Sequence, residues 1–292
     1  MAIIRPFKAL RPSQEKVNLV ASVPYDVVNR QEAKDLVQNN ELSYLKITRA
    51  EIDLPEEIDA YAEEVYLKAK ENLEKIIQQA PLNVDDRPRF YLYRLIMDGR
   101  SQTGICATFS VDDYDNDIIL KHEKTRKAKE DDRTRHIITT NAQTGVVFLT
   151  YRGVEKVNEI TNKVLNEITP EYDFISADGI QHSIWLLPDE YNQTIQDEFT
   201  KINNLYVADG HHRAKSASRA REEKMKNNPN HTGEEEYNYF IAVAFPSAEL
   251  KILPYNRVVL DLNNLSQEEF LNKIQENFDI QKTEIKEPQN QR

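Results

Sequence analysis

The sequence contains little cysteine and little glycine. Its 292 residues include one cysteine, Cys106, which excludes an internal disulfide and a zinc site built from cysteines. We expect this residue to be a small core side chain in a reducing cytoplasm, because no segment near the N-terminus resembles a signal peptide. Only seven glycines are present, so each is expected to occupy a position that needs its backbone freedom.

Positive charge and long apolar runs are also scarce. The chain has 38 Lys and Arg against 49 Asp and Glu, a formal net charge of -11 at pH 7. This balance makes nucleic acid an unlikely partner, since non-specific binding needs a basic face, but it does not exclude a local basic pocket. No apolar run approaches the roughly 18 residues that span a bilayer, so no membrane partner is expected. Neither a Walker loop nor a Rossmann glycine fingerprint is present.

The hydrophobic pattern predicts an α+β fold with a mixed sheet and surrounding helices. Residues 1–85 are expected to be a mostly helical segment that packs on the core, with helices over 30–39 and 56–79 and a strand over 42–48. Residues 86–292 are expected to form the core. Alternating residues over 90–111 predict a β-hairpin that turns at Asp98-Gly99.

The remaining elements alternate irregularly, which favours α+β over a doubly wound sheet. Residues 112–117 hold four aspartates and are interpreted as a surface turn. The polar tail after residue 285 has no closing element, so the core is expected to continue beyond it. Further strands are predicted over 145–151, 172–175, 181–187, 205–208, 237–245, 251–253 and 257–260, and helices over 154–168, 189–199, 214–226 and 267–278, the last capped by Ser266.

The most informative segment is residues 209–213, Asp-Gly-His-His-Arg, between a short apolar strand and a helix. The first N–H groups of a helix lack internal partners and lie at its positive end, so this turn predicts a phosphate site. Gly210 lets the backbone approach an anion, and Arg213 can bind two phosphate oxygens. The alternative is that Asp-Gly forms an ordinary turn and Asp209 only caps the helix.

A second charged segment covers residues 122–136. Glu123 is a candidate general base with His122 beside it. On a helix, Asp132 and His136 would share a face, where a carboxylate can orient an imidazole. The alternative is a solvated helix with many ion pairs. Residues 23–26 also have two interpretations, since Tyr25 and Asp26 either close a pocket or begin a helix.

As a set, these segments resemble a widespread bacterial and archaeal family, domain of unknown function family 1015. That family is similar to the ParB/sulfiredoxin superfamily, in which a motif between strand and helix binds nucleotide phosphates. The resemblance implies a ParB/sulfiredoxin-like mixed sheet, and family members usually extend beyond the length of this chain. The segments that carry the resemblance are 5–12, 24–27, 122–125, 132–136 and 209–213.

The nearest functional parallel within this superfamily is the free-serine kinase, which uses ADP as phosphoryl donor. The resemblance implies that Glu123 deprotonates the acceptor hydroxyl and that Asp209 assists it or holds Mg²⁺. The implied ligands are ADP or ATP and a small hydroxyl compound such as free serine. The residues implied to bind the nucleotide and its phosphate are Gly210, His211, His212, Arg213, His122, Thr125 and Arg126.

The sequence therefore predicts a nucleotide-dependent phosphotransferase. One alternative is a ParB-like nucleotide-binding regulator with little or no turnover. Another is a metal-dependent phosphohydrolase that uses His122, Glu123, Asp209 and His211, although their spacing matches no standard metal site. Sulfiredoxin chemistry is disfavoured because it needs a cysteine in the turn, where this chain has His211 and His212.

Overall fold

The structure is a computed structural model that describes residues 2–253 and 258–284. The chain divides into two compact units, Met1–Glu249 and Leu250–Arg292. The first unit contains residues 1–85 together with residues 86–249 of the predicted core. Within the described ranges, no helix is long and apolar enough to cross a membrane.

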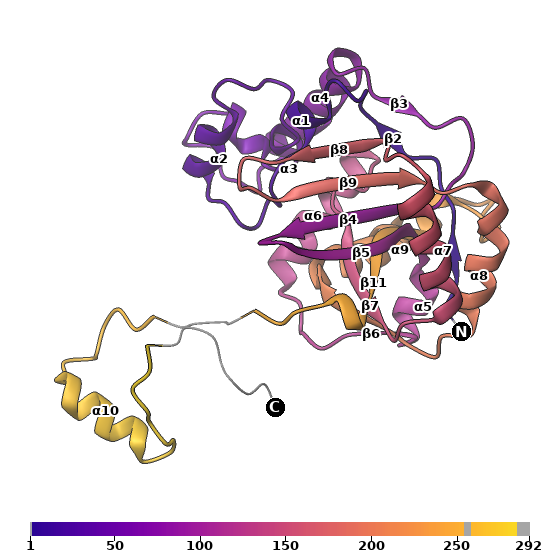
Figure 1. The fold of residues 1–292 in the computed structure, drawn as a ribbon. Coiled ribbons are helices and arrows are strands. Elements are labelled where there is room, and N and C mark those ends of the chain that lie inside the picture. The colour runs from indigo at the N-terminus through magenta and orange to yellow at the C-terminus, as the bar shows by residue number, and fades with distance from the viewer. Residues whose placement is uncertain (1, 254–257, 285–292) are drawn as a thin grey trace. The chain divides into compact units, whose positions relative to one another are not determined.

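A mixed sheet forms the centre of the first unit (Figure 1). Among the described residues, its nine strands comprise the path β6-β10-β7-β11-β5-β4-β9-β8 and β1, which pairs with β5. β10 runs parallel to β6 and β11 runs parallel to β7, while the other pairs are antiparallel. The mixed sheet confirms the α+β prediction. The strands are β1 (Ile4–Arg5), β4 (Tyr91–Met97), β5 (Arg100–Ser110), β6 (Ile119–Leu120), β7 (Val147–Tyr151), β8 (Tyr172–Ile175), β9 (Gln181–Leu186), β10 (Leu205–Asp209) and β11 (Tyr239–Pro246).

The predicted hairpin is confirmed as β4 and β5. Asp98 and Gly99 both have positive φ, 51° and 76°, as a tight two-residue hairpin turn requires. A separate small ladder pairs β2 (Leu10–Arg11) with β3 (Asn83–Val84). This ladder links the start of the chain to the segment that leads into β4.

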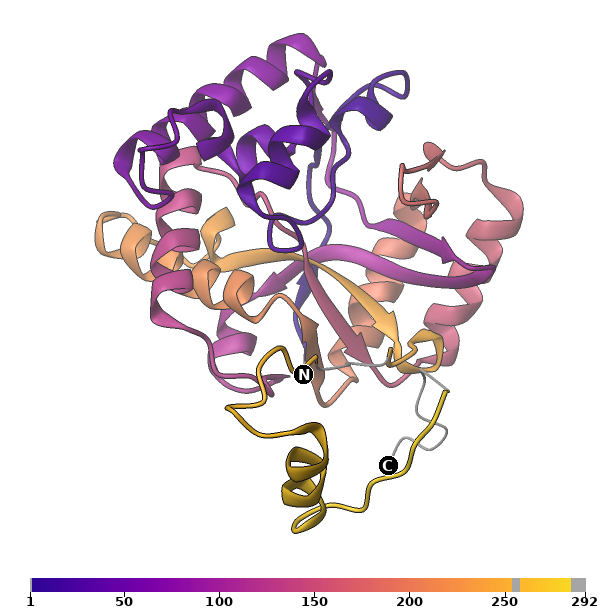
Figure 2. The ribbon, with the colours of Figure 1, turned by 90° about the vertical axis from the view of Figure 1, so that its left-hand side faces the viewer.

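Helices cover both faces of the sheet (Figure 2). α6 (Lys127–Thr140) and α9 (His211–Lys226) lie on one face, beside the short α5 (Val111–Asp115). α7 (Glu155–Glu167) and α8 (Asn192–Thr200) cover the other face. Buried side chains from both layers and from the strands form one large core cluster, which fixes the position of β10 and α9.

The N-terminal segment is helical and packs on α6 through α4 (Glu63–Gln79). The Tyr66 hydroxyl donates a 3.0 Å hydrogen bond to Asp132 across this contact. The other helices of the segment are α1 (Val17–Val20), α2 (Arg30–Val37), α3 (Leu45–Thr48) and the 3-10 turn η1 (Ala50–Asp53). Further 3-10 turns are η2 (Asp189–Tyr191), η3 (Glu236–Asn238) and η4 (Ser247–Glu249).

Several local predictions are wrong. Residues 42–48 were predicted as a strand, but Leu45–Thr48 form α3, whose buried side chains pack against α4. The helix predicted from residue 56 begins at Glu63, after a series of turns. The aspartate-rich turn contains helix α5. Its Asp113 is buried, and the carboxylate accepts a 2.6 Å hydrogen bond from the Ile3 amide.

The second unit contains α10 (Gln267–Gln275). Ser266 and Glu269 form the predicted capping box at its start, and the helix ends earlier than predicted. Residues 251–253 and 258–260 form no strand, contrary to prediction. Arg257, the first residue of the latter prediction, lies outside the described residues.

Candidate functional site

The turn between β10 and α9 depends on Gly210. Its φ is 90°, a conformation that costs a residue with a side chain about 1–2 kcal/mol. A Cβ atom there would lie 3.3 Å from the Arg213 guanidinium carbon and 3.4 Å from Val147 Cα. The glycine therefore allows the chain to leave β10 and enter α9 without displacing β7.

The N-terminus of α9 has no side-chain cap. The Gly210 carbonyl accepts from the Ala214 N–H at 3.0 Å, which is the first hydrogen bond of the helix. In the described part of the chain, the three preceding amides, of His211, His212 and Arg213, donate no hydrogen bond. These amides and the positive end of the helix dipole make the turn suitable for an anion.

The loop after β6 packs against the start of α9. The His122 amide donates to His211 Nε2 at 3.5 Å, and the Arg126 amide donates to His212 Nε2 at 3.1 Å. A ring nitrogen that accepts carries no proton, so in both rings Nδ1 is the nitrogen that can donate. The rings of His122 and His211 meet edge to face with centroids 4.4 Å apart.

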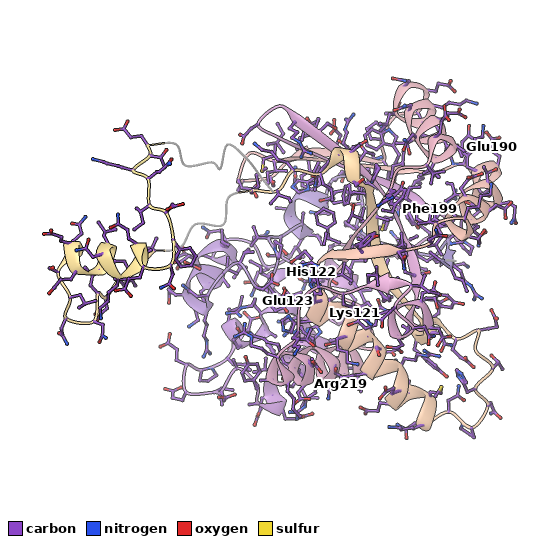
Figure 3. All side chains as sticks on the ribbon, turned by 90° about the horizontal axis from the view of Figure 1, so that it is seen from below. Lys121, His122, Glu123, Glu190, Phe199 and Arg219 are labelled. Carbon is purple, nitrogen blue, oxygen red and sulfur yellow. The ribbon has the colours of Figure 1, made fainter. Side chains whose placement is uncertain are left out.

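This loop places Glu123 beside the turn, and Figure 3 shows Glu123 next to His122. Its Oε2 lies 3.7 Å from His211 Nδ1, and its side chain is 59% exposed while that of His211 is 3% exposed. Burial, followed by the charge of His122, lowers the pKa of His211 below its usual range, so its imidazole is neutral at neutral pH. Glu123 is thus an accessible carboxylate close to the uncapped amides, and its role as a base stays a prediction.

Arg213 is held by protein acceptors. Its Nη2 donates a 2.6 Å hydrogen bond to Asp209, and its Nη1 donates to the Val146 carbonyl. Asp26 Oδ2 lies 3.7 Å from the same Nη2. The guanidinium therefore joins β10, the residue before β7 and the N-terminal segment. A phosphate bound by the Arg213 guanidinium would have to share that guanidinium with Asp209.

Thr125 and Arg126 lie where the loop enters α6. The Thr125 hydroxyl donates to the Glu130 carboxylate, and Arg126 is the residue before the first turn of α6. Arg126 reaches α9 through its backbone amide. Both predicted nucleotide-binding residues therefore lie near the turn, and Thr125 already has a protein partner.

Two carboxylates, in the turn and beside it, are exposed enough to serve as metal ligands. Asp209 and Glu123 have exposed side chains, 65% and 59%. Mg²⁺ in nucleotide sites takes one or two carboxylates and completes its shell with phosphate oxygens and water. Within residues 2–253 and 258–284, no group of three or more His, Cys, Asp or Glu side chains is arranged to hold a metal ion by itself.

A pocket adjoins the turn. The sequence predicts a role for Arg213 and offers Tyr25 as a residue that could close a pocket, but it gives Thr48 and Arg133 no role in the site. Its two hollows share Tyr25, Thr48, Arg133 and His136 in their linings, and Arg213 lines one of them. One signal was available, because segments 24–27 and 132–136 carry the family resemblance together with the turn. The spacing of these segments in the sequence does not predict that they meet in the fold.

His136 connects three parts of this pocket. Its Nε2 donates to the Ile47 carbonyl at 3.0 Å, and its Nδ1 accepts from the Thr144 hydroxyl at 3.3 Å. Asp132 and His136 both lie on α6 as predicted, but among the described contacts no hydrogen bond joins them, so Asp132 does not orient the imidazole directly. Asp132 instead accepts from Arg133 at 2.9 Å, which leaves the imidazole to the backbone and Thr144.

We expect His136 to make stability depend on pH. Burial, followed by Arg133, lowers its pKa from 6.5 to about 4. Because the unfolded state binds this proton more readily, stability present above pH 6.5 is lost as the pH falls toward 4. Between about pH 7 and pH 5 this amounts to about 2 kcal/mol. Urea unfolding of the protein and of His136→Gln at both pH values measures it, and equal losses in the two proteins would contradict it.

Together these features define an α+β protein with an uncapped helix N-terminus, an adjacent carboxylate and a pocket lined by tyrosine and arginine side chains. The model of the family described as Protein of unknown function (DUF1015) matches residues 4–292, so the chain belongs to this family. Neither the curated proteins nor the solved structures gave a match.

Proposed function

We propose that this protein is a nucleotide-dependent phosphotransferase that acts on a small hydroxyl compound such as free serine, with ADP or ATP as donor and Mg²⁺. The observation that carries the proposal is the free N-terminus of α9 with Glu123 beside it. The helix N-terminus binds the anion, and Glu123 is a base that solvent and substrate can reach. The family resemblance of the same segments supports it, and the proposal includes a ParB/sulfiredoxin-like fold.

The proposed chemistry uses the chain in three ways. The amides of His211, His212 and Arg213 bind the oxygens of the phosphate that is transferred. Glu123 takes the proton of the acceptor hydroxyl while the hydroxyl oxygen forms a bond to the terminal phosphorus. The bond from that phosphorus to the bridging oxygen breaks, and the shortened nucleotide leaves with those electrons. A magnesium ion bound with the nucleotide near Asp209 would neutralise phosphate charge.

A single-turnover assay tests this function. The protein is mixed in excess with ADP or ATP labelled in the terminal phosphate, with Mg²⁺ and a panel of hydroxy-amino acids and other small alcohols. The proposal predicts a labelled phosphoester with at least one donor and acceptor. Nucleotide binding without transfer to any acceptor would reject it.

Gly210→Ala is expected to weaken nucleotide binding. The added methyl group would lie 3.3 Å from the Arg213 side chain, and alanine would have to adopt the positive φ of Gly210. The turn must therefore shift, and its amides lose their alignment. We expect about a tenfold rise in Kd by calorimetry, consistent with about 1–2 kcal/mol of strain. Gly99→Ala is the control, because Gly99 also has positive φ but no atom within 4 Å of the new methyl. Equal affinities in the two variants would contradict this role.

A regulator that binds nucleotide without turnover is the second candidate. The contact of Arg213 with Asp209 favours it, because a guanidinium already paired with a carboxylate contributes less charge to a transition state. Calorimetry with CTP, ATP and ADP separates the two functions when combined with the transfer assay. Tight binding of one nucleotide with no labelled product would support the regulator.

A further inference from the structure

We infer that the pocket between the N-terminal segment and α6 binds a small hydroxy acid through its carboxylate. The identity of this ligand as the phosphate acceptor rests on the proposed function, whereas its binding does not. The motif resemblance gives no acceptor-binding residues, so the pocket supplies a part of the site that was missing. The residues that carry the inference are Tyr25, Arg133 and Arg213.

Charged side chains line the pocket. Four cationic side chains and two carboxylates line the two hollows, although the whole chain has a net charge of -11. Arg49 pairs with Glu51, Arg133 with Asp132 and Arg213 with Asp209. The binding of an anion therefore depends on the donors that these ion pairs leave open, and not on an excess of positive charge. The charged lining residues are Arg49, Lys129, Arg133, Arg213, Glu51 and Asp132.

Tyr25 offers a free donor. Its side chain lines both hollows and the residue is 9% exposed. Within the described residues its hydroxyl makes no hydrogen bond, and its ring is instead covered by the Arg133 guanidinium at 4.3 Å. Burial raises the pKa of this hydroxyl, so it remains a neutral donor at neutral pH. A hydroxyl that lines a pocket and has no described protein partner is available to a ligand or to water.

Arg133 offers the second donor. Its Nε donates to Asp132 at 2.9 Å and its Nη1 to the Thr48 carbonyl at 3.5 Å, while its Nη2 donates to no described residue. The guanidinium is therefore fixed on one side and open on the other. A planar carboxylate matches an open guanidinium edge with a neighbouring hydroxyl donor.

Arg213 connects the pocket to the phosphate site. It lines the second hollow and belongs to the first turn of α9, whose amides are free. A ligand held by its carboxylate at Arg133 would extend toward Arg213 and the α9 N-terminus. A hydroxyl at the other end of a short acid is then the group nearest the proposed phosphate. This arrangement favours a hydroxy acid over a simple alcohol.

Calorimetry on the full chain without nucleotide tests the inference. The probes are glycolate, L-lactate and glycerate, each compared with its uncharged counterpart, which is ethylene glycol, propylene glycol or glycerol. We expect at least one acid to bind at least tenfold more tightly than its counterpart. Failure of all three acids to bind, or equal binding of acids and alcohols, would overturn the inference.

Variants locate the binding. Tyr25→Phe should raise the Kd of the acid that binds by about tenfold, as expected for the loss of one hydrogen bond to a charged group. Arg133→Lys should weaken it by at least as much, because lysine keeps the charge but loses the planar edge. Tyr151→Phe is the matched control, since Tyr151 is a buried tyrosine with no described hydrogen bond and does not line either hollow. Equal affinities in Tyr25→Phe and Tyr151→Phe would place the acid elsewhere.

Two further outcomes separate this inference from the proposed function. Acid binding that depends on Tyr25, without phosphoryl transfer, would keep the inference and reject the phosphotransferase. Transfer to an alcohol without measurable acid binding would reject the inference and keep the phosphotransferase. If Tyr25→Phe weakens nucleotide binding and not acid binding, the pocket belongs to the nucleotide, which also overturns the inference.

Discussion

Glu123→Gln is expected to slow phosphoryl transfer by about 100-fold or more, with nucleotide affinity nearly unchanged. Glutamine keeps the size of the side chain but cannot accept the proton of the acceptor hydroxyl, and a positioned base contributes about 100-fold to 10,000-fold. Its contact with the protein is the 3.7 Å approach to His211, so folding should be preserved. Single-turnover transfer rates and nucleotide calorimetry measure the two effects separately.

Glu190→Gln is the control for this variant. Glu190 is exposed in η2, and Figure 3 shows it far from the loop that carries Glu123. Its substitution should leave transfer unchanged. If Glu123→Gln transfers phosphate at the rate of Glu190→Gln, Glu123 is not the base. If Glu123→Gln instead loses nucleotide affinity, its role lies in binding the donor or its metal.

Asp132→Ala is expected to lower the free energy of unfolding by about 3 kcal/mol, the usual cost of leaving a buried charge without its partner. Asp132 is 5% exposed and accepts hydrogen bonds from Tyr66 at 3.0 Å and from Arg133 at 2.9 Å. The variant leaves the Arg133 guanidinium buried and unpaired between α6 and the N-terminal segment. Urea unfolding measures the change, and for a domain of this size Tm should fall by roughly 6–12 °C.

Asp131→Ala is the matched control. The neighbouring carboxylate lies on the same helix, but its side chain is 44% exposed and its partners, Lys127 and Arg219, lie at the surface. Exposed ion pairs contribute little, so this variant should unfold close to the wild type. Similar unfolding midpoints for Asp132→Ala and Asp131→Ala would show that the buried pair does not join the N-terminal segment to α6.

Local features of the fold were predictable where a short segment determines its own structure. Asp98-Gly99 predicts the β4–β5 turn because both positions adopt positive φ. Ser266 and Glu269 predict the start of α10 because they satisfy each other's backbone amides. Residues 42–48 show the limit, since their apolar pattern also suits a strand and only packing against α4 makes them helical.

The candidate site divides in the same way. Gly210 between an apolar strand and a helix predicts the turn at the start of α9, and the family resemblance links that turn to Glu123. Tyr25 was a candidate pocket residue, but its neighbours in the pocket were not predictable. Tyr25, Arg133 and Arg213 are distant in sequence and meet only through the packing of α4, α6 and α9. The partners of Arg213 could not be predicted from the sequence either, since Val146 and Asp26 approach it from other segments.

A crystal structure with ADP or a non-hydrolysable ATP analogue and Mg²⁺ tests the proposed site most directly. We predict that the terminal phosphate accepts hydrogen bonds from the amides of His211, His212 and Arg213, with the Glu123 carboxylate within reach of a hydroxyl placed opposite the leaving oxygen. A terminal phosphate bound away from the α9 N-terminus, or a Glu123 carboxylate too far from it to touch an acceptor, would contradict the proposal.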